Sequence, residues 1–241
     1  DIFDALFGDN PEANAIAHEA YNAAYRRHFG KVLPFQEGMY DYLKFLKQCG
    51  VKIGVVTNRS REFLNIELQS VEQGRWQNLF DVTLCGDEAR RYKPAPDSLQ
   101  QAAQAVDEPM NQHVWYVGDS VTDMATASQA GNTSVFYNGA LWSNDWFAHM
   151  FPYDEDHYQG PDCIVEDFDH LLDVVINSIE RSERRSEFTF PEVRPKRLPQ
   201  RQLPPARQEP DWHPAVANLV YPKVILFDWH ATLVDTLDAM Y

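Results

Sequence analysis

The chain has 241 residues, a formal net charge of −15 and a hydrophobic content of 44%. These values are typical of a globular protein with one sizeable α/β domain, or with one domain and a small accessory lobe. The acidic balance argues against nucleic-acid binding by the whole surface. No apolar run in the sequence approaches the roughly 18 residues of a membrane-spanning helix.

The cysteines and the first residues indicate where the protein works. Cys49, Cys85 and Cys163 lie far apart and form no CxxC pair, which argues against a zinc knuckle or a disulfide framework. The opening DIFDALFGDNPEAN lacks a basic stretch followed by an apolar one, so we expect no signal peptide. We therefore expect a cytoplasmic protein, whose natural start need not be present because the chain begins with Asp.

Apolar runs of strand length alternate with helical patterns along the chain. Short, fully apolar strands between helices indicate an α/β fold with a doubly wound parallel sheet covered on both faces. In chain order, we expect helices over 11–28 and 38–49, a strand over 51–56, a helix over 60–72, a strand over 81–85, a helix over 96–106 and a strand over 113–117. A helix over 122–130, strands over 133–137 and 163–165, a helix over 167–181, a strand over 223–227 and a helix over 232–241 follow.

Two segments depart from this alternation. Residues 138–158 are rich in aromatic side chains, which either line an entrance or cover an apolar edge that includes a dimer contact. Residues 186–222 hold eight of the fifteen prolines and show no apolar periodicity, so we expect an extended, poorly packed arm or linker. Within 181–207 there are eight Arg or Lys against three Glu. Two interpretations of this segment stay open, namely a solvated tether and a tail that binds a nucleic-acid or protein partner.

Polar residues follow four of the expected strands. In a parallel α/β sheet these positions lie at the carboxyl edge, where ligands bind, so we expect them to converge on one crevice. Thr57 and Asn58 follow the strand at 51–56, Lys93 comes after 81–85, Asp119, Ser120 and Asp123 follow 113–117, and Asp228 and His230 follow 223–227.

These residue types suit phosphoryl chemistry. Asp119, Asp123 and Asp228 would repel one another without a cation between them, and oxygen ligands select a hard ion such as Mg²⁺. Lys93 and the metal would neutralise phosphoryl oxygens, while Thr57 and backbone N–H groups donate hydrogen bonds. An aspartate in line with phosphorus could then attack and form an aspartyl-phosphate.

Four motifs carry these residues, namely FDWHATLVDT, VVTNRS, the lysine of YKPAP and VGDSVTDMATASQAG. Together they resemble the haloacid dehalogenase superfamily of phosphohydrolases over residues 39–180 and 223–241. The resemblance implies a Rossmann-like doubly wound parallel sheet with a small helical cap. It also implies an activity, namely Mg²⁺-dependent hydrolysis of a phosphomonoester of a small metabolite.

The resemblance assigns roles to individual residues. It implies Asp228 as nucleophile, and Mg²⁺ held by Asp228, Asp119 and the backbone carbonyl of His230. Asp123 would support the metal site, and Thr57 and Lys93 would bind phosphate. Asn58 is a weaker phosphate-binding candidate, because it and Ser120 could simply cap the helices that follow them.

The motif order departs from that of the family, in which the nucleophile strand comes first. Moving 186–241 in front of residue 1 restores the family order without altering any motif. A natural circular permutant, an engineered one and a sequence of fragments set out of order all fit, and we favour the last. The resemblance divides the chain into a partial helical cap (1–38), a core (39–181), a proline-rich basic arm or linker (182–222) and the nucleophile strand with its following helix (223–241).

His230 is the second departure. Family phosphatases normally have an aspartate there, which protonates the leaving oxygen and then activates water. A histidine, with an ordinary pKa near 6.5, could do both at neutral pH. DWHAT is also close to the phosphonoacetaldehyde hydrolase pattern, whose chemistry needs a cap lysine, and the cap offers only Lys31. Dehalogenation fits less well, because GDSVTD supplies a full metal site and the dehalogenases of the family lack one.

Two further alternatives remain. His230 could mark a degenerate phosphatase kept as a binding or scaffold module, with the basic arm engaging an anionic partner such as nucleic acid. Basic residues Arg26, Arg27 and His28 could meet an anionic substrate, although basic residues also favour helix C-termini, and we prefer that second explanation.

Overall fold

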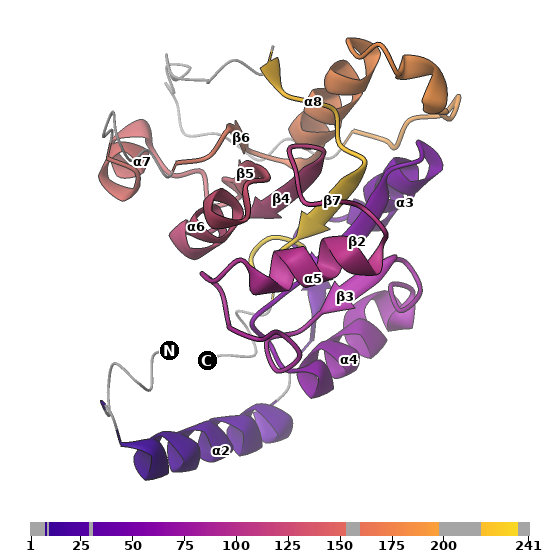
Figure 1. Ribbon diagram of the computed structural model, residues 1–241. Coiled ribbons are helices and arrows are strands. Elements are labelled where there is room, and N and C mark those ends of the chain that lie inside the picture. The colour runs from indigo at the N-terminus through magenta and orange to yellow at the C-terminus, as the bar shows by residue number, and fades with distance from the viewer. Residues whose placement is uncertain (1–7, 9, 29–30, 153–159, 198–217, 236–241) are drawn as a thin grey trace.

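The computed structural model of the chain describes residues 8, 10–28, 31–152, 160–197 and 218–235 (Figure 1). Six strands form one sheet at the centre of the molecule, and helices cover both of its faces. In the part of the chain that is described, no helix is both long enough and apolar enough to cross a membrane.

The central sheet has the strand order β3-β2-β7-β4-β5-β6, and every neighbouring pair is parallel. Its strands are β2 (Lys52–Val56), β3 (Val82–Leu84), β4 (Val114–Gly118), β5 (Thr133–Tyr137), β6 (Cys163–Val165) and β7 (Val224–Phe227). All six strands expected from the sequence are confirmed, and no end differs by more than one residue. The last of them in chain order, β7, lies between β2 and β4 in the middle of the sheet.

The α-helices lie between and beside these strands. They are α2 (Pro11–His28), α3 (Met39–Gln48), α4 (Arg61–Ser70), α5 (Asp97–Ala105), α6 (Val121–Ala130), α7 (Asn144–Met150) and α8 (Phe168–Glu180). Short 3₁₀ turns, η1 (Val71–Gly74) and η2 (Arg185–Glu187), follow α4 and α8. Six of the expected helices are confirmed to within two residues, whereas α7 lies in a segment for which no helix was expected.

Side chains of β7 alternate between two apolar layers. Ile225 and Phe227 pack in the layer beneath α3, α4 and α8, whereas Val224 and Leu226 pack in the layer beneath α5 and α6. All four are 0% exposed. Because successive strand residues point to opposite faces, a strand covered by helices on both sides has to be apolar at every position.

The expected helix over 232–241 is wrong at its start. Thr232 and Leu233 lie in a turn, and Val234–Asp235 forms strand β8, which pairs antiparallel with β1 (Leu33–Pro34). Leu233 and Val234 are fully buried in the larger apolar layer. Their apolar side chains, which look like one face of a helix in the sequence, instead close the core beside β1. Residues 236–241 of the expected helix lie outside the described residues.

The expectation of poor packing over 186–222 is wrong at both described ends. Phe188 and Tyr221 are each 8% exposed and meet edge to face, with 5.4 Å between ring centroids. The Trp115 indole also donates a hydrogen bond of 2.9 Å to the carbonyl of Val220. These contacts anchor the start and the end of the segment on the core, while 198–217 lie outside the described residues.

Helix α2 packs against α4 through its last turns. Tyr25 lies edge-on against Phe63, with 4.7 Å between ring centroids. Arg26 donates two hydrogen bonds of 2.7 Å to Glu62, so this basic side chain is paired within the protein. The division into a partial cap, a core, an arm and a nucleophile segment stays a prediction, with bounds 1–38, 39–181, 182–222 and 223–241.

Candidate active site

The strand register brings the predicted site residues to one edge of the sheet. Val55 of β2 and Val117 of β4 both pair with Phe227 of β7. Asp228 follows Phe227 directly, and Asp119 comes two residues after Val117. The carboxyl ends of the three central strands therefore meet, as the sequence predicts for a parallel sheet.

Lys93 lies at the centre of this edge, and its side chain is only 5% exposed. Its ammonium group donates hydrogen bonds of 2.8 Å to Asp228 Oδ1, 2.7 Å to Asp123 Oδ1 and 2.8 Å to the Tyr116 hydroxyl. Asn58 holds the backbone of Lys93, because its Oδ1 accepts from the Lys93 N–H at 2.9 Å and its Nδ2 donates to the Lys93 carbonyl at 3.3 Å. Asn58 thus positions the lysine instead of capping a helix.

Asp123 lies in the first turn of α6 and forms a capping box with Ser120. The Ser120 hydroxyl accepts from the Asp123 N–H, and Asp123 Oδ2 accepts from the Ser120 N–H at 3.2 Å and from its hydroxyl at 2.6 Å. Gly118 is needed next to this box, because a Cβ there would lie 2.5 Å from Asp123 Cβ and Cγ. Ser120 therefore has the capping role that the sequence suggested, and it also orients the Asp123 carboxylate.

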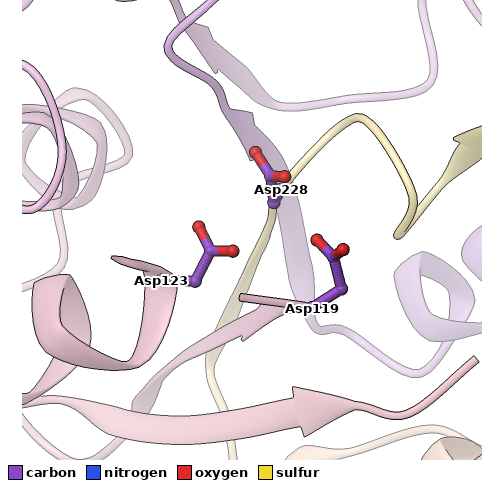
Figure 2. Close-up of side chains that lie close together, drawn as sticks. All are labelled: Asp119, Asp123 and Asp228. Carbon is purple, nitrogen blue, oxygen red and sulfur yellow. The ribbon is translucent and has the colours of Figure 1, made fainter. Parts of the chain in front are cut away.

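The three aspartates form one acidic cluster. Figure 2 shows the carboxyl groups of Asp119, Asp123 and Asp228 around the same space at the end of β7. Each offers one oxygen, and these oxygens lie within 4.8 Å of one another. Both Asp123 oxygens already accept hydrogen bonds from Lys93, Tyr116 or Ser120. Asp119 and Asp228 are therefore the better candidates for direct contact with a metal ion, with Asp123 in support.

The neighbours of each aspartate give the three carboxyl groups different acidities. Burial, followed by repulsion from Asp228 and Asp123, raises the pKa of Asp119 to about 7. Burial would also raise the pKa of Asp123, but Lys93 and Ser120 hold it below its ordinary value. Burial raises the pKa of Asp228, and the nearby Lys93 offsets only part of that rise.

The charge on Lys93 is stabilised in turn. Burial would lower the pKa of this lysine, but Asp123 and Asp228 raise it above its ordinary value. The ammonium group therefore stays charged where it meets both carboxylates. Two carboxylates beside one lysine leave an excess of negative charge, to which Asp119 adds, and such a site attracts a cation.

Thr57 lies at the end of β2 and is 4% exposed. Its hydroxyl oxygen accepts a hydrogen bond of 3.1 Å from the backbone N–H of Arg59, so it caps the turn that leads to α4. Its place beside the central strand agrees with a phosphate-binding role, which stays a prediction. Lys31, the only cap lysine for phosphonate chemistry, is exposed.

The side chain of His230 contacts a residue that sequence reasoning missed. Its Nε2 lies 3.1 Å and 3.3 Å from the two carboxylate oxygens of Glu67 on α4. Glu67 is 0% exposed, and although burial would raise its pKa, His230, Tyr25 and Arg59 hold the pKa below its ordinary value. A signal for Glu67 was present, because a charged residue interrupts the buried apolar stripe of α4.

Tyr116 is a second residue that the sequence did not single out. It is fully buried on β4, accepts a hydrogen bond from Lys93 and donates to Asp123 Oδ1 at 2.9 Å. Aromatic residues are common in buried strands, so nothing in the run HVWYV distinguishes it from a core residue. Its hydroxyl extends the hydrogen-bonded set around the lysine.

Other predicted contacts lie away from the acidic cluster. Arg27 Nε donates to the carbonyl of Ala23 within α2, which supports the helix-end explanation for the basic residues there. The side chain of His28 lies outside the described residues. Part of the basic segment 181–207 is engaged within the chain, since Arg184 pairs with Glu187 and Arg194 with Asp173. A nucleic-acid or protein partner for this segment stays a prediction.

The fold and the site together define an α/β protein with a candidate active site at the carboxyl edge of its parallel sheet. The model of the haloacid dehalogenase-like hydrolase family matches residues 1–137, which is more than half of the chain. The chain belongs to this family, and its class is that of a hydrolase. The matched residues include Thr57, Lys93, Asp119 and Asp123, whereas Asp228 lies outside them.

Similar proteins agree with this family. Pyrophosphatase PpaX of Halalkalibacterium halodurans is 25% identical over 175 residues, which are 73% of this chain and 74% of that protein. A protein of Caldanaerobacter subterraneus subsp. tengcongensis with the provisional name pyrophosphatase PpaX is 29% identical over 167 residues, or 69% of either chain. A crystal structure of a hydrolase from Pseudomonas syringae matches with a TM-score of 0.56 at 20% identity, covering 73% of this chain and 77% of that one. This last likeness shows the fold.

Proposed function

We propose that this chain is a Mg²⁺-dependent phosphohydrolase that uses Asp228 as its nucleophile. The observation that carries the proposal is the contact of the Lys93 ammonium group with both Asp228 and Asp123, at 2.8 Å and 2.7 Å, beside a third carboxylate. This arrangement combines a nucleophilic oxygen, a buried cation and metal-ligand oxygens at one sheet edge. The names of the pyrophosphatase relatives support the same class of reaction.

The donor set fits a hard divalent cation. Asp119 and Asp228 offer carboxylate oxygens. Burial, and then repulsion from the neighbouring carboxylates, raises the pKa of Asp119, and a metal ion would relieve that repulsion. The backbone carbonyl of His230 is a third proposed ligand. When bound, Mg²⁺ would neutralise charge on the phosphoryl oxygens.

Asp228 performs the first chemical step. One of its carboxylate oxygens attacks phosphorus, the bond between phosphorus and the leaving oxygen breaks, and that oxygen takes up a proton. Water then attacks the phosphorus of the aspartyl-phosphate, which releases inorganic phosphate and restores the carboxylate. Lys93 balances charge on the phosphoryl group, and Thr57 donates a hydrogen bond to it.

His230 is the proposed proton donor and acceptor. Its imidazole replaces the aspartate that family phosphatases normally have, and Glu67 holds it by Nε2. A histidine held by a carboxylate is a common arrangement for proton transfer, because the carboxylate fixes the ring orientation and the tautomer. The proposed substrates are phosphomonoesters of small metabolites, with pyrophosphate as the additional candidate that the relatives suggest.

Hydrolysis of a substrate panel tests this proposal. Phosphate release from small phosphomonoesters and from pyrophosphate is measured after EDTA treatment and after Mg²⁺ is restored. We expect activity only with the metal, and Asp228→Asn should lower it on the order of a thousandfold or more, because the nucleophile is lost. Asp41→Asn is the matched control, since the Asp41 side chain is 61% exposed on α3.

Three results would contradict the proposal. One is hydrolysis that continues in Asp228→Asn at the wild-type rate, since the nucleophile would then lie elsewhere. Another is full activity in EDTA. The third is a wild-type chain that releases no phosphate from any member of the panel with Mg²⁺ present.

A further inference from the structure

A single buried carboxylate gathers side chains from three parts of the chain. Glu67 of α4 accepts a hydrogen bond of 2.6 Å from the Trp229 indole and lies 3.1 Å from His230 Nε2. The guanidinium of Arg59 lies 3.3 Å from its Oε1, and the Tyr25 hydroxyl of α2 donates to the same oxygen. Helix α2, the turn after β2 and the turn after β7 therefore meet at one residue.

Packing alone does not explain a glutamate at this position. Phe63, Leu64 and Leu68 form the buried stripe of α4, and Glu67 lies on the same face at helical spacing. A leucine there would continue the apolar stripe, whereas a buried carboxylate is costly unless several donors satisfy it. The side chains that donate to Glu67 therefore stabilise a buried charge that packing alone does not require.

Two of these donors belong to the turn that carries the nucleophile. Trp229 and His230 come directly after Asp228 in the chain. Trp229 is 0% exposed, and its ring meets Trp76 and Phe80 edge to face, at centroid distances of 6.0 Å and 6.2 Å. Its indole N–H therefore has a fixed direction, toward Glu67.

Backbone bonds close the same turn from the other side. The N–H groups of Leu233 and Val234 each donate a hydrogen bond of 3.0 Å to the carbonyl of Trp229. Ala231, in the middle of the turn, has a φ of 57°, a value that side-chain-bearing residues rarely adopt. A turn with this strained backbone needs side-chain contacts that hold it in place. Among the described residues, Glu67 is the acidic residue that contacts both Trp229 and His230.

We propose that Glu67 is a positioning residue for the reaction at Asp228, because it fixes the Trp229 indole and the His230 imidazole and so orients the turn between them and the nucleophile. The proposal rests on the proposed function. Glu67 acts on the reaction through its contacts with Trp229 and His230. Its bond with Tyr25 extends the same anchor to α2, so the position of that helix is tied to the turn.

Substitution of Glu67 by Gln tests this role. The amide keeps the size of the side chain but loses the charge and one of the two acceptor oxygens. Trp229 and His230 meet Oε2 while Tyr25 and Arg59 meet Oε1, so one oxygen can no longer serve both sets of donors. We expect kcat to fall about tenfold to a hundredfold with KM within about twofold, because residues that orient reacting groups affect turnover more than substrate binding. Glu62→Gln is the matched control, since Glu62 also joins α4 to α2 but is 50% exposed and pairs with Arg26 instead of Trp229 or His230.

A second variant guards against misfolding. Glu67→Asp keeps the charge beside Arg59 but is one methylene shorter, so it withdraws from His230. We expect this variant to melt near the wild-type temperature and still to lose kcat. Unchanged kcat in both folded variants would overturn the proposal, because the anchor would then have no bearing on turnover.

A readout without substrate separates this proposal from the proposed function. The indole N–H of Trp229, assigned by its loss in Trp229→Phe, should shift in the ¹H–¹⁵N spectrum of Glu67→Gln. Hydrogen exchange at Leu233 and Val234 should become faster, and Glu62→Gln should change neither property. A wild-type chain without hydrolase activity contradicts the proposed function, and the spectrum then decides this inference. An unmoved indole together with unchanged exchange would overturn it.

Discussion

Asp119 and Asp123 have the same side chain but different pKa values, because different residues surround each carboxyl group. Lys93, Ser120 and Tyr116 hold the pKa of Asp123 low, whereas burial and then the carboxylates of Asp228 and Asp123 raise the pKa of Asp119. The position of the His230 ring likewise depends on its contact with the Glu67 carboxylate. An aspartate at position 230, as in family phosphatases, would face the buried carboxylate of Glu67 and be repelled by it. The histidine and the glutamate are therefore a matched pair.

The raised pKa of Asp119 predicts how the metal-free chain responds to pH. Its ordinary pKa is 3.8 and its pKa in the folded chain is about 7, so the folded chain holds a proton that the unfolded chain releases. This group therefore lowers the free energy of unfolding progressively as pH rises from about 4 to about 7. Asp119→Asn should remove that decrease, which makes the variant more stable than the wild type at about pH 8 in EDTA.

Urea unfolding at about pH 5 and about pH 8 checks this expectation. The gain from Asp119→Asn should be larger at the higher pH, and Mg²⁺ should stabilise the wild type more than the variant. An equal change in unfolding free energy at both pH values would show that Asp119 titrates normally.

Elements decide how closely these residues approach one another. The carboxyl end of β4 meets the first turn of α6 so closely that Gly118 has no room for a side chain. The capping box of Ser120 and Asp123 begins at this junction, so helix formation and orientation of the carboxylate depend on the same bonds.

Gly118→Ala should damage the site through this junction. The new methyl group would displace Asp123, so we expect a loss of about 1–3 kcal/mol in unfolding free energy and a weaker stabilisation by Mg²⁺. Gly131→Asn is the matched control at the other end of α6, because Gly131 has a φ of 73°, open space around it and a conformation that Asn tolerates. Urea unfolding with and without Mg²⁺ measures both effects. A Gly118→Ala chain as stable as wild type, with full Mg²⁺ response, would contradict the expectation.

Patterns of apolar residues in the sequence predicted the six central strands but not α7 or the segment at 232–235. The six central strands could be predicted because each is a short apolar run that needs only cover on both faces. Helix α7 was missed because it has seven residues, and its start depends on the Ser143 cap instead of a long periodic stripe. The segment at 232–235 was misread because Leu233 and Val234 are buried beside β1, a partner about two hundred residues away in the chain.

At the scale of the molecule, β7 is the central strand although it comes late in the chain. It pairs with β2 on one side and β4 on the other, so this sheet forms although its middle strand is the last of the six in chain order. The hypothesis that the motif order reflects fragments set out of order stays a prediction. Intact mass and N-terminal sequencing check it, and one continuous chain with Asp1 at its measured start would contradict it.

The sequence by itself determined the parallel α/β sheet and the acidic residues at its edge, because apolar strand runs and the polar residues after them are local patterns. Lys93, Asp119, Asp123 and Asp228 could be placed near one another from this rule alone. Only the tertiary structure decided which partners hold them. Tyr116 and Glu67 became visible through contacts between residues far apart in the chain, and hydrogen bonds of that kind depend on distances that no local pattern contains.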